Sequence, residues 1–127
     1  LVCILTIISL KQNDIGLPVD IILLTGDTNE SRIDATYYEI SNYAILYIDS
    51  FKSKKTNQGY GSLLLGELNN IVKDINDILQ YYKLKTIKSI EGIVVAEKNI
   101  ISEELLKNLY IKYGFKIDCK NNMIKYL

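Results

Sequence analysis

The chain has 127 residues, a formal net charge of zero and no histidine. This length fits one folded domain over residues 1–127 with its own hydrophobic core. The balanced charge gives no sign of a nucleic-acid partner. Without histidine, Ser-His-Asp and Cys-His catalysis and most catalytic zinc sites are excluded, and we expect no metal.

The first half of the chain predicts four β-strands. Apolar or alternating runs at 1–10, 19–25, 33–41 and 43–51 favour strands, and the polar segment 26–31 is typical of a turn. Short connections between successive strands indicate an antiparallel meander. The opening run is too short to span a bilayer, which takes about 20 residues, and it lacks the features of a signal peptide. We therefore expect no membrane partner.

The second half changes to a helical period. Apolar residues form one continuous face over 61–82, which predicts a long amphipathic helix. A strand follows at 88–96, and the helical crossover makes it roughly parallel to the fourth strand. A second helix is expected at 103–113, ended by Gly114, and a final strand at 115–127. The order β-β-β-β-α-β-α-β predicts an α+β domain with a mixed, mostly antiparallel sheet.

The two cysteines, Cys3 and Cys119, lie near opposite ends of the chain. Isolated cysteines are typically buried small hydrophobic residues in a reducing compartment, which predicts a cytoplasmic protein. A disulfide between them is the alternative, if the terminal strands meet.

A glycine-rich turn joins the fourth strand to the long helix. Its residues are Gln58, Gly59, Tyr60, Gly61 and Ser62. Glycines let the backbone come close to a ligand, and the free amides of a helix's first turn bind anions. A dinucleotide fingerprint would need a third glycine where Leu64 stands, and a nucleotide P-loop would need a lysine that the turn lacks. The turn therefore predicts an anion site of another kind.

Two motifs resemble the GNAT superfamily of acyl-CoA-dependent N-acetyltransferases. The family's motif A reads Gln/Arg-x-x-Gly-x-Gly/Ala and lies across residues 56–61, with Thr56 in the first position. Residues 109–115, Leu-Tyr-Ile-Lys-Tyr-Gly-Phe, resemble its late helix-to-strand signature. The resemblance covers roughly 43–127. Upstream, the family usually places two helices between its first and second strands, and the connection here is too short for that pair, which is absent or truncated.

The resemblance implies that the chain binds acetyl-CoA. In the family, the amides of this turn hold the CoA pyrophosphate, a role that falls here to Gln58 through Ser62. The end of the fourth strand, Asp49-Ser50-Phe51, would present its backbone to the pantetheine arm, beside a bulge that parts the fourth and fifth strands. Tyr110 matches the tyrosine that often protonates the leaving CoA thiolate. The alternative for Tyr110 is packing at the edge of the core.

The resemblance also implies direct transfer of the acetyl group to a small-molecule or peptide amine. Carboxylates are the remaining candidates for a general base, and Asp49, Glu91 and Glu97 fall on the strands that would flank the acyl group. Solvated strand residues, with water relaying the proton, are the alternative. The alternative function is a CoA-binding or degenerate domain that acts through protein contacts, including a homodimer through exposed strand edges.

Overall fold

The computed structural model describes residues 2–9, 16–26, 28–53, 59–96 and 102–127. These residues form nine elements in the order ββββαβαββ. They are β1 (Val2–Ile8), β2 (Leu17–Thr25), β3 (Thr28–Ile40), β4 (Tyr43–Ser53), α1 (Tyr60–Tyr81), β5 (Ile87–Ile93), α2 (Glu103–Lys112), β6 (Lys116–Ile117) and β7 (Asn122–Tyr126). The α+β class is as the sequence predicts.

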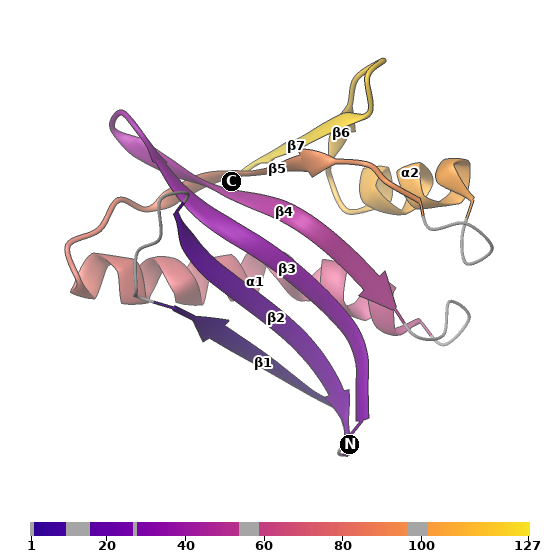
Figure 1. Ribbon diagram of the computed structural model, residues 1–127, viewed down its shortest axis with the longest axis horizontal. Coiled ribbons are helices and arrows are strands. Elements are labelled where there is room, and N and C mark those ends of the chain that lie inside the picture. The colour runs from indigo at the N-terminus through magenta and orange to yellow at the C-terminus, as the bar shows by residue number, and fades with distance from the viewer. Residues whose placement is uncertain (1, 10–15, 27, 54–58, 97–101) are drawn as a thin grey trace.

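The strands form one mixed sheet in the order β1-β2-β3-β4-β5-β7-β6 (Figure 1). Strands β1 to β4 are an antiparallel meander, in which each strand pairs with the next one along the chain. Strand β5 pairs with β4 in parallel, because α1 carries the chain back across the sheet before β5 begins. The predicted meander and the predicted parallel crossover are both confirmed.

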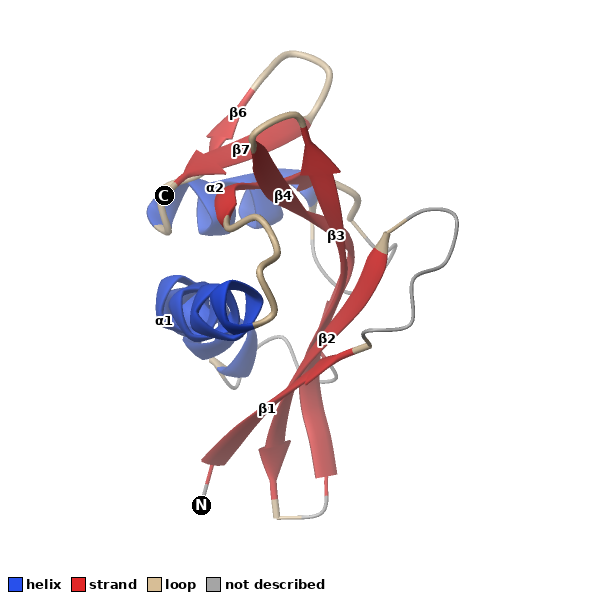
Figure 2. Cartoon of the chain, turned by 90° about the vertical axis from the view of Figure 1, so that its left-hand side faces the viewer, coloured by secondary structure: helices blue, strands red, loops and turns tan. Residues whose placement is uncertain are grey.

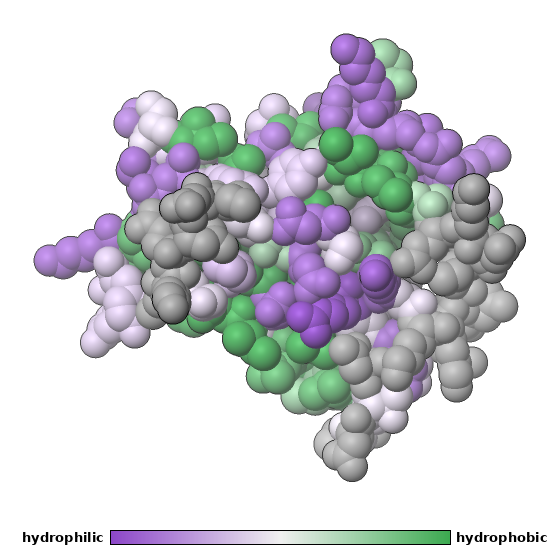
Figure 3. Space-filling view, viewed as in Figure 1, coloured by the Kyte–Doolittle hydropathy of each residue, from purple (hydrophilic) through white to green (hydrophobic). Residues whose placement is uncertain are grey.

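Both helices cover the same face of the sheet (Figure 2). Helix α1 buries its apolar stripe there, and Leu64, Leu68 and Val72 have no exposed surface. The opposite face, seen in Figure 3, carries polar side chains across the middle of the strands with apolar groups around them. Only residues 9–16 separate β1 from β2, which is too short for the helix pair that the family usually has there.

The structure differs from the expected elements at two hairpins. Strand β3 begins at Thr28, inside the segment predicted as a turn, because the polar residues 28–31 pair with the end of β2 across a bulge between Leu23 and Leu24. The expected final strand is a β6–β7 hairpin. Asn121 turns the chain between these strands with φ 64°, a left-handed conformation that asparagine tolerates.

Helix α2 begins and ends close to the residues expected from the sequence. The Ser102 hydroxyl accepts a hydrogen bond from the amide of Leu105 at 3.2 Å, and Gly114 leaves the helix with φ 95°. The prediction of buried thiols is wrong, because Cys3 and Cys119 are both exposed and free. Within the described ranges, no helix is long and apolar enough to cross a membrane.

Candidate active site

Strand β4 carries a bulge where it parts from β5. Asp34 of β3 pairs with Ser50, and the next β3 residue pairs with Ile48, so Asp49 is the extra residue on β4. The parallel pairing of β4 with β5 ends at the rung that joins Ile48 to Gly92, although β4 continues to Ser53. Beyond this rung the two strands are no longer hydrogen-bonded to each other, and the β4 backbone can bond to a ligand.

The gap after this rung holds a cavity of about 170 Å³. Its lining residues come from β4, from the end of β5 and from α2. They are Ile48, Asp49, Ser50, Phe51, Lys52, Ile93, Val95 and Tyr110. The predicted pantetheine-binding segment and the predicted acid therefore line one cavity, although they are about 60 residues apart in the chain.

The glycine turn forms the start of α1. Gly59 is the N-cap and has φ 75°, a left-handed conformation that glycine adopts without steric cost. The first helical hydrogen bond runs from the amide of Leu63 to the carbonyl of Gly59, at 2.9 Å. The amides before Leu63, those of residues 59–62, are therefore the four that a helix start leaves without a helical partner. Four of the five predicted phosphate donors are in this set, and Gln58 lies outside the described residues.

Gly61 connects this turn to the gap. A Cβ at position 61 would lie 3.0 Å from Cζ of Phe51 and 3.7 Å from Cβ of Ser53. Phe51 also lines the cavity, so one aromatic ring contacts both the helix start and the gap. A ligand with an anionic group at the turn and an uncharged arm in the gap would contact both features.

Tyr110 lines the cavity and is buried against aromatic rings. Only 3% of its surface is exposed, and its ring centroid lies 6.0 Å from that of Phe51 and 5.3 Å from that of Phe115. Burial raises the pKa of Tyr110 well above that of a free phenol. The hydroxyl therefore keeps its proton at neutral pH, as a proton donor must.

Ser62 and Tyr113 form a contact that the sequence does not predict. The Ser62 hydroxyl is hydrogen-bonded to the Tyr113 hydroxyl, which joins the first turn of α1 to the end of α2. Tyr113 also packs beside Gly66, where an added Cβ would be 3.3 Å from its ring. Tyr113 therefore has a hydrogen-bonding role besides the packing that the sequence suggests.

Two of the three candidate base carboxylates lie near the end of the strand pairing. Asp49 accepts a hydrogen bond from Thr36 at 2.6 Å, and Glu91 accepts one from Ser89 at 2.9 Å. Glu97 lies outside the described residues. The described part of the chain brings no three metal-ligating side chains together.

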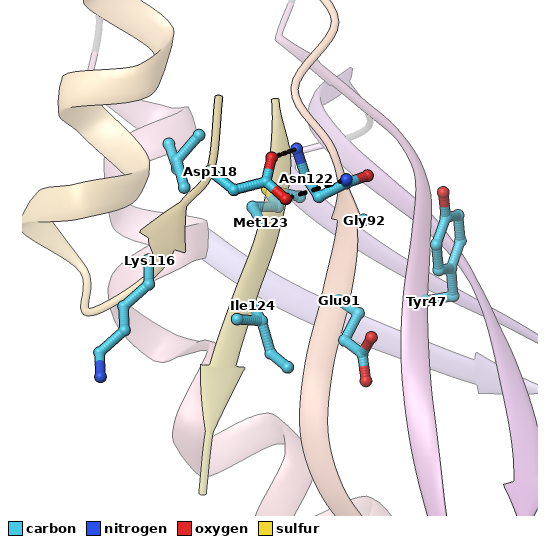
Figure 4. A pocket seen from close by; sticks show the side chains of 9 residues that line it. Tyr47, Glu91, Gly92, Lys116, Asp118, Asn122, Met123 and Ile124 are labelled. Atoms are coloured by element: carbon cyan, nitrogen blue, oxygen red, sulfur yellow. Dashed lines mark hydrogen bonds between the residues drawn. The ribbon is translucent and has the colours of Figure 1, made fainter. Parts of the chain in front are cut away.

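A second cavity, of about 340 Å³, is lined by the side chains drawn in Figure 4. Its lining comes from the middle of β4 and β5 and from the β6–β7 hairpin. The residues are Tyr47, Glu91, Gly92, Lys116, Ile117, Asp118, Asn122, Met123 and Ile124. The sequence does not predict this cavity, because it depends on the hairpin that was expected to be one strand.

No protein-family model matches the chain, and no curated protein sequence matches it. Solved structures do match the fold. The AtaT–AtaR complex bound to DNA gives a TM-score of 0.59 at 12% identity, over 86% of this chain and 67% of that one. An acetyltransferase of the GNAT family from Streptococcus pneumoniae gives 0.54 at 16% identity, over 87% and 66%. This chain thus spans about two thirds of the length of either.

A third match is a proposed streptothricin acetyltransferase from Bacillus anthracis str. Ames in complex with acetyl coenzyme A. Its TM-score is 0.54 at 14% identity, over 100% of this chain and 87% of that one. At such low sequence identity, the matches establish a similar backbone fold and say nothing about which side chains the active sites share. Together with the mixed sheet and its two helices, these matches show that the chain has the fold of GNAT acetyltransferases.

Proposed function

We propose that the chain is an N-acetyltransferase that moves the acetyl group of acetyl-CoA directly to an amine. The observation that carries the proposal is the contact between Gly61 and Phe51, which places an anion-binding helix start against the gap between β4 and β5. Acetyl-CoA needs both features, because it has an anionic pyrophosphate at one end and an amide-rich arm with a thioester at the other.

The residues present fit this donor. The amides of Gly59, Tyr60, Gly61 and Ser62 bind the pyrophosphate, and the positive end of the α1 dipole adds to the attraction. The backbone of Asp49, Ser50 and Phe51 pairs with the amides of the arm, as an unpaired strand edge does with an extended ligand. The cavity of about 170 Å³ accommodates the acetyl-thioester end rather than the whole molecule.

The chemistry needs a polarised carbonyl and a proton for the leaving sulfur. Backbone amides of β4 polarise the thioester carbonyl while the neutral amine attacks its carbon. The new C–N bond forms, the C–S bond breaks, and Tyr110 gives its proton to the departing thiolate. The amine loses its own proton to a carboxylate or to water, and Asp49 is the candidate carboxylate that lines the gap.

A thermal-shift series with acetyl-CoA, CoA and NAD tests the donor, because a ligand that binds only the folded chain raises its melting temperature. We expect a shift with both CoA species and none with NAD. Thiol release from acetyl-CoA in the presence of amines then tests transfer. A chain that responds to neither CoA species does not have this function.

The second candidate is a domain that binds CoA and acts through protein contacts. It is favoured by the free edge strand β1, where Val2, Leu5 and Ile7 are all more than 40% exposed. One protein of the same fold is found in a complex with a partner protein and DNA. A shift with CoA but no thiol release across an amine panel would favour this candidate.

A further inference from the structure

The two cavities meet at the last paired rung of β4 and β5. Tyr47 and Glu91 are partners on the rung before it, and both line the larger cavity. Asp49 and Ile93, just beyond the rung, line the smaller one. A transfer reaction needs two substrates that meet at one atom, and the rung of Ile48 and Gly92 is where ligands of the two cavities would meet.

The larger cavity has an acidic and an aromatic side chain one rung away from this meeting point. Tyr47 and Glu91 alternate with the buried Leu46 and Ile90, so they lie on the face of the sheet away from the helices. Asp49 is directed to the same face, where it bonds to Thr36. Two carboxylates therefore flank the Tyr47 ring.

The pKa of Tyr47 is consistent with carboxylates lying close to its ring. Its pKa is raised mainly by burial, and the carboxylates of Asp49 and Glu91 raise it further. The ring of Tyr38 meets the ring of Tyr47 edge-on, with centroids 6.4 Å apart and planes at 82°. An aromatic face with carboxylates beside it favours an organic cation.

The other charged groups of the cavity do not neutralise Glu91. Lys116 extends on the far side of β7 from Glu91 (Figure 4). Asp118 is bonded to the amides of Lys120 and Asn122, each at 2.9 Å, and so serves the hairpin turn. Glu91 is thus the carboxylate of this cavity that lies beside Tyr47, and it accepts a hydrogen bond from the Ser89 hydroxyl at 2.9 Å, on the side away from Gly92 (Figure 4).

We infer that the larger cavity binds a second positive charge of the acceptor, and that the acceptor is a small diamine or a similar dibasic amine. One ammonium group lies between Glu91 and the Tyr47 ring, and the other nitrogen, as a neutral amine, reaches the gap beside Asp49. Asp49 lies two residues beyond Tyr47, the partner of Glu91, so the two carboxylates are diagonal neighbours, a separation that a short carbon chain spans. The identification of this amine as the acceptor rests on the proposed function, but the cation site does not.

Calorimetric titration of the chain without acetyl-CoA tests the site, at low salt so that the charges are not screened. The probes are 1,4-diaminobutane and 1-aminopentane, in which a methyl group replaces the second ammonium. Each is titrated into wild type, Glu91→Gln and the control Glu67→Gln, which removes a half-buried carboxylate of α1 that lines neither cavity. We expect the diamine to bind wild type and the control alike, about tenfold more tightly than Glu91→Gln, and the monoamine to bind weakly to all three.

The inference is overturned if wild type binds both probes equally or if Glu91→Gln keeps the affinity for the diamine. Its failure is distinct from failure of the proposed function. Binding of the diamine without any response to CoA would leave the cation site standing and remove acetyl transfer. A response to CoA with no preference for the diamine would do the reverse.

Discussion

Gly61 and Phe51 lie so close that a Cβ at position 61 would be 3.0 Å from Cζ of the ring. Phe51 is on β4 and Gly61 is in the first turn of α1, so this contact determines where the helix start lies relative to the gap. The Phe51 ring also lies near that of Tyr110, with centroids 6.0 Å apart. One side chain thus connects the anion-binding turn, the end of the strand and the proposed acid.

Gly61→Asp should abolish binding of acetyl-CoA. The carboxylate would stand among the amides that bind the pyrophosphate, while a negative charge in the first turn suits the helix dipole and should leave the fold stable. Gly61→Ala is the control, because it adds the same Cβ without the charge. Calorimetry should show acetyl-CoA binding at least 100-fold weaker in Gly61→Asp and less than tenfold weaker in Gly61→Ala. Similar affinities in both variants would mean that the turn does not hold the phosphates.

Tyr110→Phe should leave the affinity for acetyl-CoA unchanged and slow transfer by roughly 100-fold, the lower range for loss of a general acid. The ring still packs against Phe51 and Phe115, so the cavity keeps its shape. Steady-state kinetics with a fixed amine measures this. Turnover equal to that of wild type would show that Tyr110 only packs.

The pH dependence gives a separate check on Tyr110. Because burial raises its pKa, the hydroxyl stays protonated through neutral and mildly alkaline pH. The wild-type rate at saturating substrates should therefore not fall between pH 7 and about pH 9 through loss of the tyrosine proton, since even a free phenol has a pKa of about 10. An alkaline limb below pH 9 that disappears in Tyr110→Phe would contradict this account of the site.

Tyr37 should make the fold sensitive to alkali. Burial, followed by the neighbouring Glu39, raises the pKa of Tyr37 to about 12, and its hydroxyl donates a hydrogen bond to the carbonyl of Lys85 at 2.6 Å. The folded chain holds this proton more tightly than the unfolded chain. The contribution to the free energy of unfolding is therefore complete below about pH 10 and is lost as the pH rises toward 12.

Urea unfolding at several alkaline pH values tests this. Tyr37→Phe should cost about 1 kcal/mol at pH 7, through loss of the hydrogen bond, and should lose less stability than wild type above pH 10. The exposed Tyr81→Phe is the control and should behave as wild type. Parallel pH curves for Tyr37→Phe and wild type would refute this role for Tyr37.

Asn76→Ala should destabilise the fold by about 2 kcal/mol, as expected for two lost hydrogen bonds. The Asn76 side chain on α1 accepts from the amide of Ile87 at 2.7 Å and donates to its carbonyl at 3.1 Å, at the start of β5. The exposed Asn70→Ala, on the same helix, should stay within about 0.5 kcal/mol of wild type. Equal effects of the two substitutions in chemical unfolding would show that this pair of bonds contributes no stability.

The parts of the fold that repeat along the chain could be predicted from the sequence. The apolar stripe of α1 has a clear helical period, and β2 alternates between buried and half-buried residues. The β6–β7 hairpin could not be predicted with the same rules, because β6 has only two residues and shows no period. The two hydrogen bonds between Asn76 and Ile87 could not be predicted either, because an asparagine on the polar side of a helix does not indicate which residue it will bond to.

The candidate site divides in the same way. Gly59, Gly61 and Tyr110 stand in local motifs, so a sequence pattern can indicate them. The bulge at Asp49 and the cavity beside Tyr47 and Glu91 depend on how strands pair, and pairing register is set by contacts between distant segments. For the part of the site that would bind the amine, the sequence therefore predicts only three candidate carboxylates and no cavity.

The most direct test of the central claim is the stoichiometry and location of acetyl-CoA binding, measured by NMR titration of amide signals. We expect one acetyl-CoA per chain, with the largest shifts at the amides of Gly59 to Ser62 and of Asp49 to Phe51, and smaller shifts elsewhere. No shifts at saturating acetyl-CoA, or shifts that spare both the helix start and the end of β4, would contradict it.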